Sequence, residues 1–464
     1  MSPRNAPVRF DEARPLALSL ARSAADEGYA VLLVRDVRGR FTLIVDDREQ
    51  AVDDERRERW HTALVERLTP YVTGRPLTLA SQMITAEALL NSRRAETDTL
   101  RPSGGAGSVR LLDNTVVGED WAKVSTPGPE ADGSRTHRTA LYGFKGGVGR
   151  TTATAMLARR LADDGHIVLV VDLDLESPGA GPLLAGPERL PPNGIVDHLV
   201  EAAVGNADGL ELVARTDYVP RSRRGELWVA PARGQGTDGV LYAYVDKLNR
   251  VYADLPGSSF ADRLADAVEA CEKAVELGDS GLRPDVVLLD SRAGIHDVAA
   301  VAISRLCDLA LLFGADNAQT WTGYGDLFAA WHASGRAPDI RAKLRMVASM
   351  VPDTVHHSKD DYLGAFTARS YECFAALYDE LAPGEAPSRM ADTIARYAFA
   401  PSEKDDSAPH HPIPILFEPG LVGLGAGDAR NWQDRAFVKA AYGEFLDTAA
   451  RLITAGPGDE EGTR

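Results

Sequence analysis

Short apolar runs alternate with amphipathic stretches between residues 138 and 455, and this alternation restricts the fold more than any other feature of the chain. Uninterrupted apolar runs predict strands that are buried on both faces, and the stretches between them predict the helices that cover such a sheet. We therefore expect an α/β fold with a doubly wound, mostly parallel sheet. The predicted strands are 139–142, 167–171, 227–230, 286–289, 309–313, 344–348 and 413–417. The predicted helices are 152–163, 242–253, 259–276, 299–305, 324–333, 362–380 and 434–453.

A smaller unit precedes this region. Residues 102–108 and 126–135 are rich in Gly, Pro and Ser, which is the composition of loops or linkers. The chain thus divides into a small α/β N-terminal domain at 8–122, a linker at 123–137, the large domain at 138–455 and a flexible acidic tail at 456–464. The first domain reads as a helix (15–28), two strands in a hairpin (29–34 and 41–45) and a helix (57–68). It carries no catalytic motif, so we interpret it as an interaction domain.

The charge balance bears on the choice of partner. Acidic residues outnumber basic ones by 68 to 51, and the formal net charge is −17. Binding to nucleic acid or to anionic lipid needs clustered basic residues, so we expect neither nucleic acid nor a membrane as a partner. Three widely spaced cysteines form no disulfide framework, no apolar run is long enough for a membrane span, and the N-terminus lacks a secretory signal. These features predict a cytoplasmic location.

The most informative segment is Phe144–Thr152, which reads FKGGVGRTT and lies between a predicted strand and a predicted helix. A glycine-rich loop in this position can turn its backbone N–H groups toward phosphate oxygens, and the helix that follows adds its dipole. The predicted nucleotide-binding residues are Lys145, Gly146, Gly147, Val148, Gly149, Arg150, Thr151 and Thr152. The loop departs from GxxxxGK[ST] twice, because Phe144 replaces the first glycine and Arg150 replaces the lysine.

Acidic residues follow two of the predicted strands. Asp172 and Asp174 come directly after the strand 167–171, and Asp290 comes directly after the strand 286–289 in a Walker B pattern. In a parallel sheet these carboxylates lie at the carboxyl edge, where ligands bind. A carboxylate in such a position can orient a water molecule or hold Mg²⁺. Arg292, two residues after Asp290, is either a sensor of the nucleotide or a surface ion-pair partner.

These motifs, in this order, resemble the ParA/MinD/ArsA (SIMIBI class) family of deviant-loop ATPases, in a bacterial variant group that carries KGGVGR. The resemblance spans about residues 138–455. It implies a P-loop NTPase fold that binds ATP and Mg²⁺ and forms a homodimer around two ATP molecules. In the roles it implies, Lys145 reaches the partner's nucleotide and Asp174 orients the attacking water, which makes both catalytic. Arg150 contacts the β- and γ-phosphates, and Thr151, Asp172 and Asp290 serve the metal.

The resemblance predicts an ATP-hydrolysing switch that regulates an unidentified protein partner through the N-terminal domain. The alternative is an ATP-bound scaffold or nucleotide sensor with little or no turnover, because Arg150 replaces the loop lysine. A kinase of the bacterial tyrosine-kinase type is less favoured, because residues 443–464 contain no tyrosine. DNA partitioning is less favoured because of the acidic charge. The histidine pairs at 356–357 and 410–411 lack ligand spacing, so we interpret them as ordinary polar residues.

Overall fold

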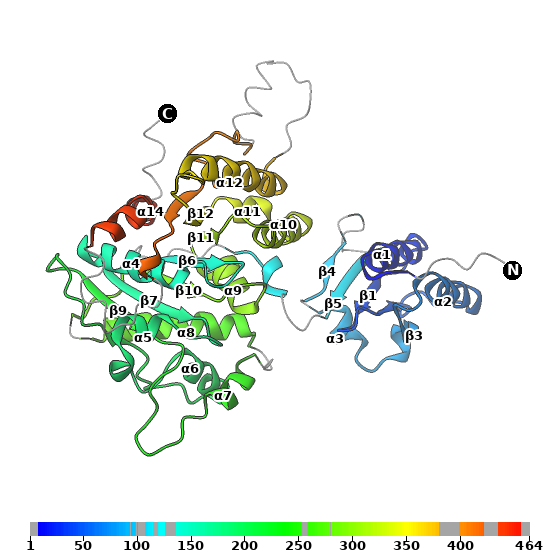
Figure 1. Ribbon diagram of the computed structural model, residues 1–464. Coiled ribbons are helices and arrows are strands. Elements are labelled where there is room, and N and C mark those ends of the chain that lie inside the picture. The colour runs from blue at the N-terminus through cyan, green and yellow to red at the C-terminus, as the bar shows by residue number, and fades with distance from the viewer. Residues whose placement is uncertain are drawn as a thin grey trace. The chain divides into compact units, whose positions relative to one another are not determined.

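The computed structural model describes residues 8–92, 94–98, 100, 107–114, 119–125, 136–252, 258–278, 280–379, 399–421 and 435–455. The chain divides into two compact units, Met1–Val117 and Gly118–Arg464, which are both drawn in Figure 1. Most of the two predicted linker segments, at 102–106 and 126–135, and the predicted tail at 456–464 lie outside the described residues. Each unit is considered separately below.

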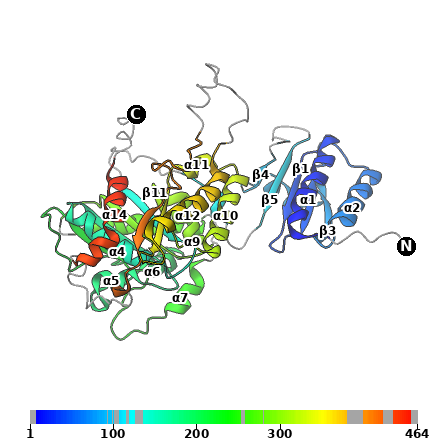
Figure 2. The same ribbon diagram turned by 45° about the horizontal axis from the view of Figure 1, so that its top comes forward.

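The N-terminal unit is a five-stranded sheet with helices on both faces. Its elements are α1 (Phe10–Asp26), β1 (Val31–Arg35), β2 (Phe41–Val45), α2 (Asp54–Leu68), β3 (Val72–Leu79), α3 (Ala86–Leu90), β4 (Glu96–Thr97) and β5 (Val109–Asp113). The strand order is β3-β2-β1-β5-β4, and β1 and β2 form the antiparallel hairpin that the sequence predicts. Helices α1 and α2, labelled in Figure 2, cover one face of this sheet, and Leu20 of α1 and Trp60 of α2 belong to the core beneath them. Leu89 and Leu90 of α3 pack on the other face.

Strand β3 is absent from the sequence prediction. Gly74 and Pro76 interrupt the apolar pattern in Val72–Leu79, and both residues are typical of edge strands or bulges rather than central ones. In the structure β3 is an edge strand, and its register with β2 shifts between Phe41 and Leu43. The two interrupting residues therefore fit the observed position of the strand.

The C-terminal unit is an eight-stranded sheet in the order β13-β12-β11-β6-β10-β7-β9-β8, parallel except for the β8–β9 pair. Its strands are β6 (His137–Gly143), β7 (Ile167–Leu173), β8 (Ala214–Arg215), β9 (Glu226–Ala230), β10 (Val286–Ser291), β11 (Leu309–Gly314), β12 (Leu344–Val351) and β13 (Ile413–Leu416). Its longer helices are α4 (Arg150–Asp163), α6 (Ile195–Ala202), α7 (Tyr244–Val251), α8 (Phe260–Glu276), α10 (Ala318–Ala333), α12 (Lys359–Phe374) and α14 (Ala436–Thr454). Shorter helices are α5 (Ala180–Ala185), α9 (Asp297–Val301) and α11 (Ala337–Arg341).

All seven predicted strands and seven predicted helices of this unit are present, with bounds shifted by a few residues. The predicted helix at 299–305 is α9 followed by a π-helical turn, Ala302–Leu306. The sequence prediction missed α5, α6, α11 and β8. These four elements have at most eight residues, too few to establish a clear period. Within the described residues, no helix is long and apolar enough to cross a membrane.

Helices cover both faces of the large sheet, as Figures 1 and 2 show. One core lies between the sheet and α4, α5 and α14, with Leu157 and Phe445 among its members. The other lies under α6, α8, α9, α10 and α12, and includes Val268 and Phe328. This arrangement confirms the predicted doubly wound α/β fold. It also brings the carboxyl ends of the neighbouring strands β6, β10 and β7 to one edge of the sheet.

A buried ion cluster supports the start of β6, the strand that leads into the glycine-rich loop. The Glu272 carboxylate of α8 is fully buried and accepts two hydrogen bonds from the guanidinium of Arg138, at 2.8 and 3.0 Å. It accepts a third from Arg283 at 2.9 Å. A buried carboxylate is tolerated only when its charge is paired in this way.

Replacing Glu272 with Gln should destabilise the C-terminal unit by about 3–5 kcal/mol, because it removes the buried anion that two arginines share. Thermal unfolding of the full chain measures this effect. Glu269→Gln is the matched control, because Glu269 lies on the same helix in an exposed pair with Lys273. That change should cost only about 0.3–0.5 kcal/mol. Equal melting temperatures for the two variants would contradict a supporting role for the buried cluster.

Candidate functional site

The glycine-rich loop connects the end of β6 at Gly143 to the start of α4 at Arg150. Gly147 and Gly149 have φ angles of 79° and 77°, a left-handed conformation that side chains with a Cβ rarely adopt. Gly149 is the N-cap of α4. The strand–loop–helix context that the sequence predicts is therefore present, and the loop lies at the positive end of a 14-residue helix.

Phe144, the first departure from the usual loop pattern, packs against α10. Its ring lies against Gly323, where an added Cβ would approach the ring carbons to 2.3 Å. The ring centroid of Phe144 is also 6.3 Å from that of Tyr324. A phenyl ring in place of glycine thus fixes the start of the loop to a neighbouring helix, which is possible because residue 323 has no side chain.

Strands β7 and β10 bring the predicted acidic residues together, with Asp172 and Asp290 as register partners. The Asp172 carboxylate is fully buried. Its Oδ1 accepts a hydrogen bond from the backbone N–H of Asp174 at 3.2 Å, and its Oδ2 accepts from Gly179 and Ala180, both at 3.0 Å. Burial, and secondly the charge of Asp290, raise the pKa of Asp172 to about 7. Asp172 therefore fixes the loop that carries Asp174.

Arg150, the second departure, lies between two of the carboxylates. Its Nε donates to Oδ1 of Asp290 at 2.9 Å, and its Nη2 donates to Oδ2 of Asp174 at 3.2 Å. Only 8% of the Arg150 side chain is exposed. Burial works against the charged guanidinium, but the two carboxylates outweigh it and raise the pKa of Arg150. The sequence analysis assigned Arg150 to phosphates and did not anticipate this double ion pair.

The residues predicted to serve a magnesium ion fit that role in part. Oδ2 of Asp290 is buried and has no hydrogen-bond partner among the described residues, so it can accept from metal-bound water. Both oxygens of Asp172 already accept backbone N–H groups. Thr151 is half-buried on α4, and its methyl carbon faces Gly179, one of the residues whose N–H Asp172 accepts. Across the described parts of the chain, no three His, Cys, Asp or Glu side chains form a metal-binding group by themselves.

Lys145 and Arg292 lie on opposite sides of these carboxylates in the sequence and differ in their contacts. Lys145 is exposed, and within the described residues it makes no ion pair or side-chain hydrogen bond. Arg292, the predicted sensor, pairs with Oε2 of Glu176 at 2.5 Å. This pair connects the loop after β10 to the loop after β7.

Glu176, two residues after Asp174, is a further functional candidate. Besides Arg292, it accepts a hydrogen bond from the Tyr252 hydroxyl at 2.7 Å and lies 3.5 Å from Nε2 of His296. The Tyr244 hydroxyl donates to the Leu175 carbonyl at 2.5 Å. Tyrosines at both ends of α7 therefore hold the residues directly after Asp174. The sequence gives no signal for these contacts, because the tyrosines are about 70 residues away.

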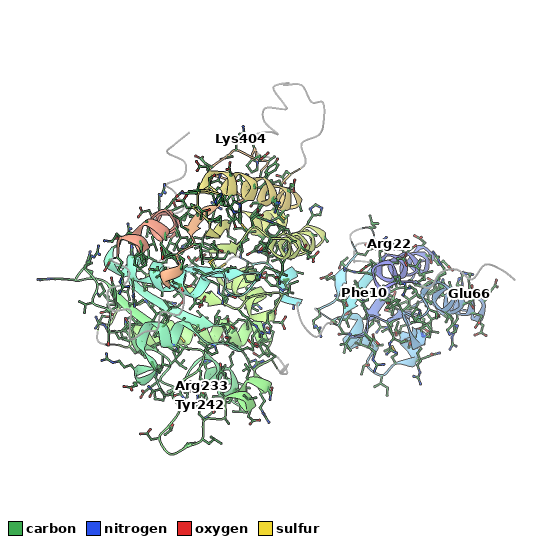
Figure 3. The ribbon with its side chains drawn as sticks, in the orientation of Figure 1. Phe10, Arg22, Glu66, Arg233, Tyr242 and Lys404 are labelled. Carbon is green, nitrogen blue, oxygen red and sulfur yellow. The ribbon has the colours of Figure 1, made fainter. Side chains whose placement is uncertain are left out.

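A polar cluster supports α7 on its other side. Figure 3 labels Arg233 and Tyr242, and the Arg233 guanidinium lies 4.7 Å from the centre of the Tyr242 ring. Tyr242 donates a 2.5 Å hydrogen bond to the buried Asp197 of α6, which also pairs with Lys247 of α7. Tyr242 stacks on Tyr244, with ring centroids 6.1 Å apart. The cluster thereby extends to the tyrosine that contacts the Asp174 loop.

Comparison with known proteins agrees with this geometry. Residues 139–358 match the family model described as the CobQ/CobB/MinD/ParA nucleotide binding domain. This match confirms the predicted ParA/MinD-type P-loop relationship, whereas the KGGVGR subgroup and the individual site residues stay predictions. No curated protein sequence matches the chain.

Several solved structures are similar to the chain in fold. One is pNOB8 ParA bound to nonspecific DNA, at 15% identity and a TM-score of 0.41, over 69% of this chain and 97% of that one. A second is the MinC:MinD cell division complex of Aquifex aeolicus, at 18% identity and a TM-score of 0.39, over 69% and 97%. A third is cobyrinic acid a,c-diamide synthase of Mycobacterium smegmatis with a bound ATP analog and magnesium, at 19% identity and a TM-score of 0.41, over 69% and 97%.

The Phe144–Gly323 contact makes a direct prediction. Gly323→Ala should destabilise the chain by about 1–3 kcal/mol, because the added methyl group displaces the Phe144 ring. Gly325→Ala on the same helix meets nothing within 4 Å and should instead stabilise it by about 0.5–1 kcal/mol. Thermal unfolding distinguishes the two variants.

The double variant Phe144→Ala with Gly323→Ala tests the cause of that difference. In the Phe144→Ala background the ring is gone, so adding Gly323→Ala should cost much less stability than it does in the wild type. If the alanine at position 323 costs the same with and without the ring, the clash is not the reason for the loss.

Proposed function

We propose that this chain, whose residues 139–358 match the CobQ/CobB/MinD/ParA nucleotide binding domain, is an ATP-binding molecular switch. The observation that carries the proposal is the glycine-rich loop at the start of α4, with the carboxylates of Asp174 and Asp290 held at its base by Arg150. The backbone N–H groups of residues 145–152 would surround the phosphates. Two chains would enclose two ATP molecules, and ATP hydrolysis would separate the two chains.

The roles of the side chains follow from their positions. The exposed Lys145 is available to reach the nucleotide of a second chain. Thr151 and Asp290 would hold Mg²⁺, with the unpartnered Oδ2 of Asp290 accepting from the ion's hydration shell. Mg²⁺, when bound, supplies positive charge beside the phosphate oxygens. Asp174 would orient the attacking water, and Asp172 would keep Asp174 in position through its hydrogen bonds to the loop backbone.

The wider setting of the switch is also a proposal. The N-terminal unit would pass the nucleotide state to a protein partner. Among the similar structures, the MinD of Aquifex aeolicus is in complex with MinC. The expectation that nucleic acid is not a partner rests on the net charge of −17 alone. The comparisons do not support it, because another similar structure is a ParA on nonspecific DNA.

One observation favours the alternative of an ATP-bound scaffold with little turnover. Arg150 pairs with Asp174, the carboxylate that would orient and deprotonate water. The pair occupies Oδ2 of Asp174, and breaking it to accept a water molecule costs free energy. Turnover therefore requires Arg150 to release Asp174, whereas nucleotide binding does not.

Steady-state ATP hydrolysis and the oligomeric state of the full chain, with ATP, with ADP and without nucleotide, test the proposal. We expect an ATP-dependent dimer, and Asp174→Ala should lower turnover by at least about a hundredfold while it keeps the dimer. Lys145→Ala should lose both turnover and the ATP-dependent dimer. Lys404→Ala removes an exposed lysine outside the loop and should behave like the wild type (Figure 3).

The other outcomes separate the two candidate functions. ATP binding and dimerisation without turnover would favour the scaffold. Turnover that survives in Asp174→Ala would refute the role assigned to that carboxylate. A chain that binds no ATP in any of these conditions would refute the proposed function itself.

A further inference from the structure

Arg150 is the cationic side chain that contacts the acidic groups of the site. Within the described residues, no other Lys or Arg pairs with Asp174 or Asp290. The two carboxylates come from different parts of the fold, one from the loop after β7 and one from the end of β10. A single guanidinium thus joins the loop after β7 to the end of β10, and both would face the phosphates.

The guanidinium has donors to spare in this position. Of the five N–H donors of an arginine, one on Nε and one on Nη2 contact the carboxylates. Nη1 has no hydrogen bond within the described residues. The residue starts α4 directly after the glycine-rich loop, so its remaining donors belong to the same site as the loop N–H groups. Arg150 can therefore hold both carboxylates and a phosphate together.

A lysine in this position would offer less. Its ammonium group is a compact point charge with three N–H donors on one atom, whereas the guanidinium spreads five donors over a planar fork that reaches separate oxygens. With fewer donors for the two carboxylates, a site with lysine should depend more on a divalent cation when the polyphosphate binds.

The local charge is already partly offset in this chain. Three carboxylates, those of Asp172, Asp174 and Asp290, lie at the strand ends, and a polyphosphate beside them would meet strong repulsion in a buried site. Arg150 pairs two of them. The third, Asp172, is offset instead by backbone N–H groups, which donate to both of its oxygens.

We propose that Arg150 is a built-in cation of the phosphate site, which pairs Asp174 and Asp290 while its remaining N–H groups receive the phosphates. As a consequence, nucleotide affinity in this chain depends only weakly on Mg²⁺. The inference rests on the proposed nucleotide-binding function and deepens it, because it separates binding from turnover. Turnover can still require Mg²⁺.

Calorimetric titration of the full chain with a non-hydrolysable ATP analogue, in Mg²⁺ and in excess EDTA, tests the inference. Removing Mg²⁺ should weaken binding to the wild type by no more than about threefold, and to Arg150→Lys by at least about tenfold, which corresponds to about 1.4 kcal/mol. Arg160→Lys is the matched control on α4, because Arg160 pairs with the exposed Asp164 and Asp447 instead. It should keep the weak Mg²⁺ dependence.

Each other result has a distinct meaning. Wild-type binding that falls tenfold or more in EDTA, or an Arg150→Lys variant as insensitive to Mg²⁺ as the wild type, would overturn the inference and leave the proposed function standing. No binding in either buffer would overturn both.

A second measurement needs no nucleotide. Arg150→Ala leaves Asp174 and Asp290 unpaired, so its melting temperature should fall, and Mg²⁺ alone should restore part of the loss. Mg²⁺ alone should not raise the melting temperature of the wild type. An Arg150→Ala variant as stable as the wild type, or a wild type that Mg²⁺ alone stabilises equally, would overturn the inference.

Discussion

The burial of carboxylates at the carboxyl ends of β7 and β10 is the constraint on which the rest of the site depends. The two strands are neighbours and pair Asp172 with Asp290 in register, so their charges cannot be separated without breaking the sheet. Buried charges of one sign are tolerated only when other groups offset them. Backbone N–H groups do so for Asp172, and the Arg150 guanidinium does so for Asp290. The conformations of the two loops are a consequence of this compensation.

The same compensation explains why the loop after β7 has so many attachments. Asp172 accepts N–H groups from both ends of the loop, and Asp174 pairs with Arg150. Glu176 accepts a hydrogen bond from Tyr252 and forms an ion pair with Arg292. A change at any of these contacts alters the position of Asp174. Tyrosine hydroxyls at the two ends of α7 attach that helix to the same loop.

The sequence predicts those parts of the fold that depend on local pattern. Buried strands, long amphipathic helices and the glycine-rich loop are each specified by residues that are close in the chain, and all were found. Contacts between distant elements leave no such pattern. Nothing near Phe144 indicates that Gly323 would receive its ring, and nothing near Glu176 points to Tyr252. Strand β3 was missed for a different reason. Its Gly74 and Pro76 are tolerated in an edge strand, but the sequence alone does not show that this segment lies at an edge.

Two departures from the usual loop pattern could mean that the phosphate site has decayed, but the structure argues otherwise. Each departure is matched by a specific feature elsewhere. The ring of Phe144 fits against a glycine that leaves room for it, and the guanidinium of Arg150 meets two carboxylates at hydrogen-bonding distance. The left-handed glycines and the open space around Gly147 are retained as well. Each of these contacts restricts the residues allowed at two positions of the chain. Both departures are thus built into the packing of the fold, which fits the phosphate site that we propose.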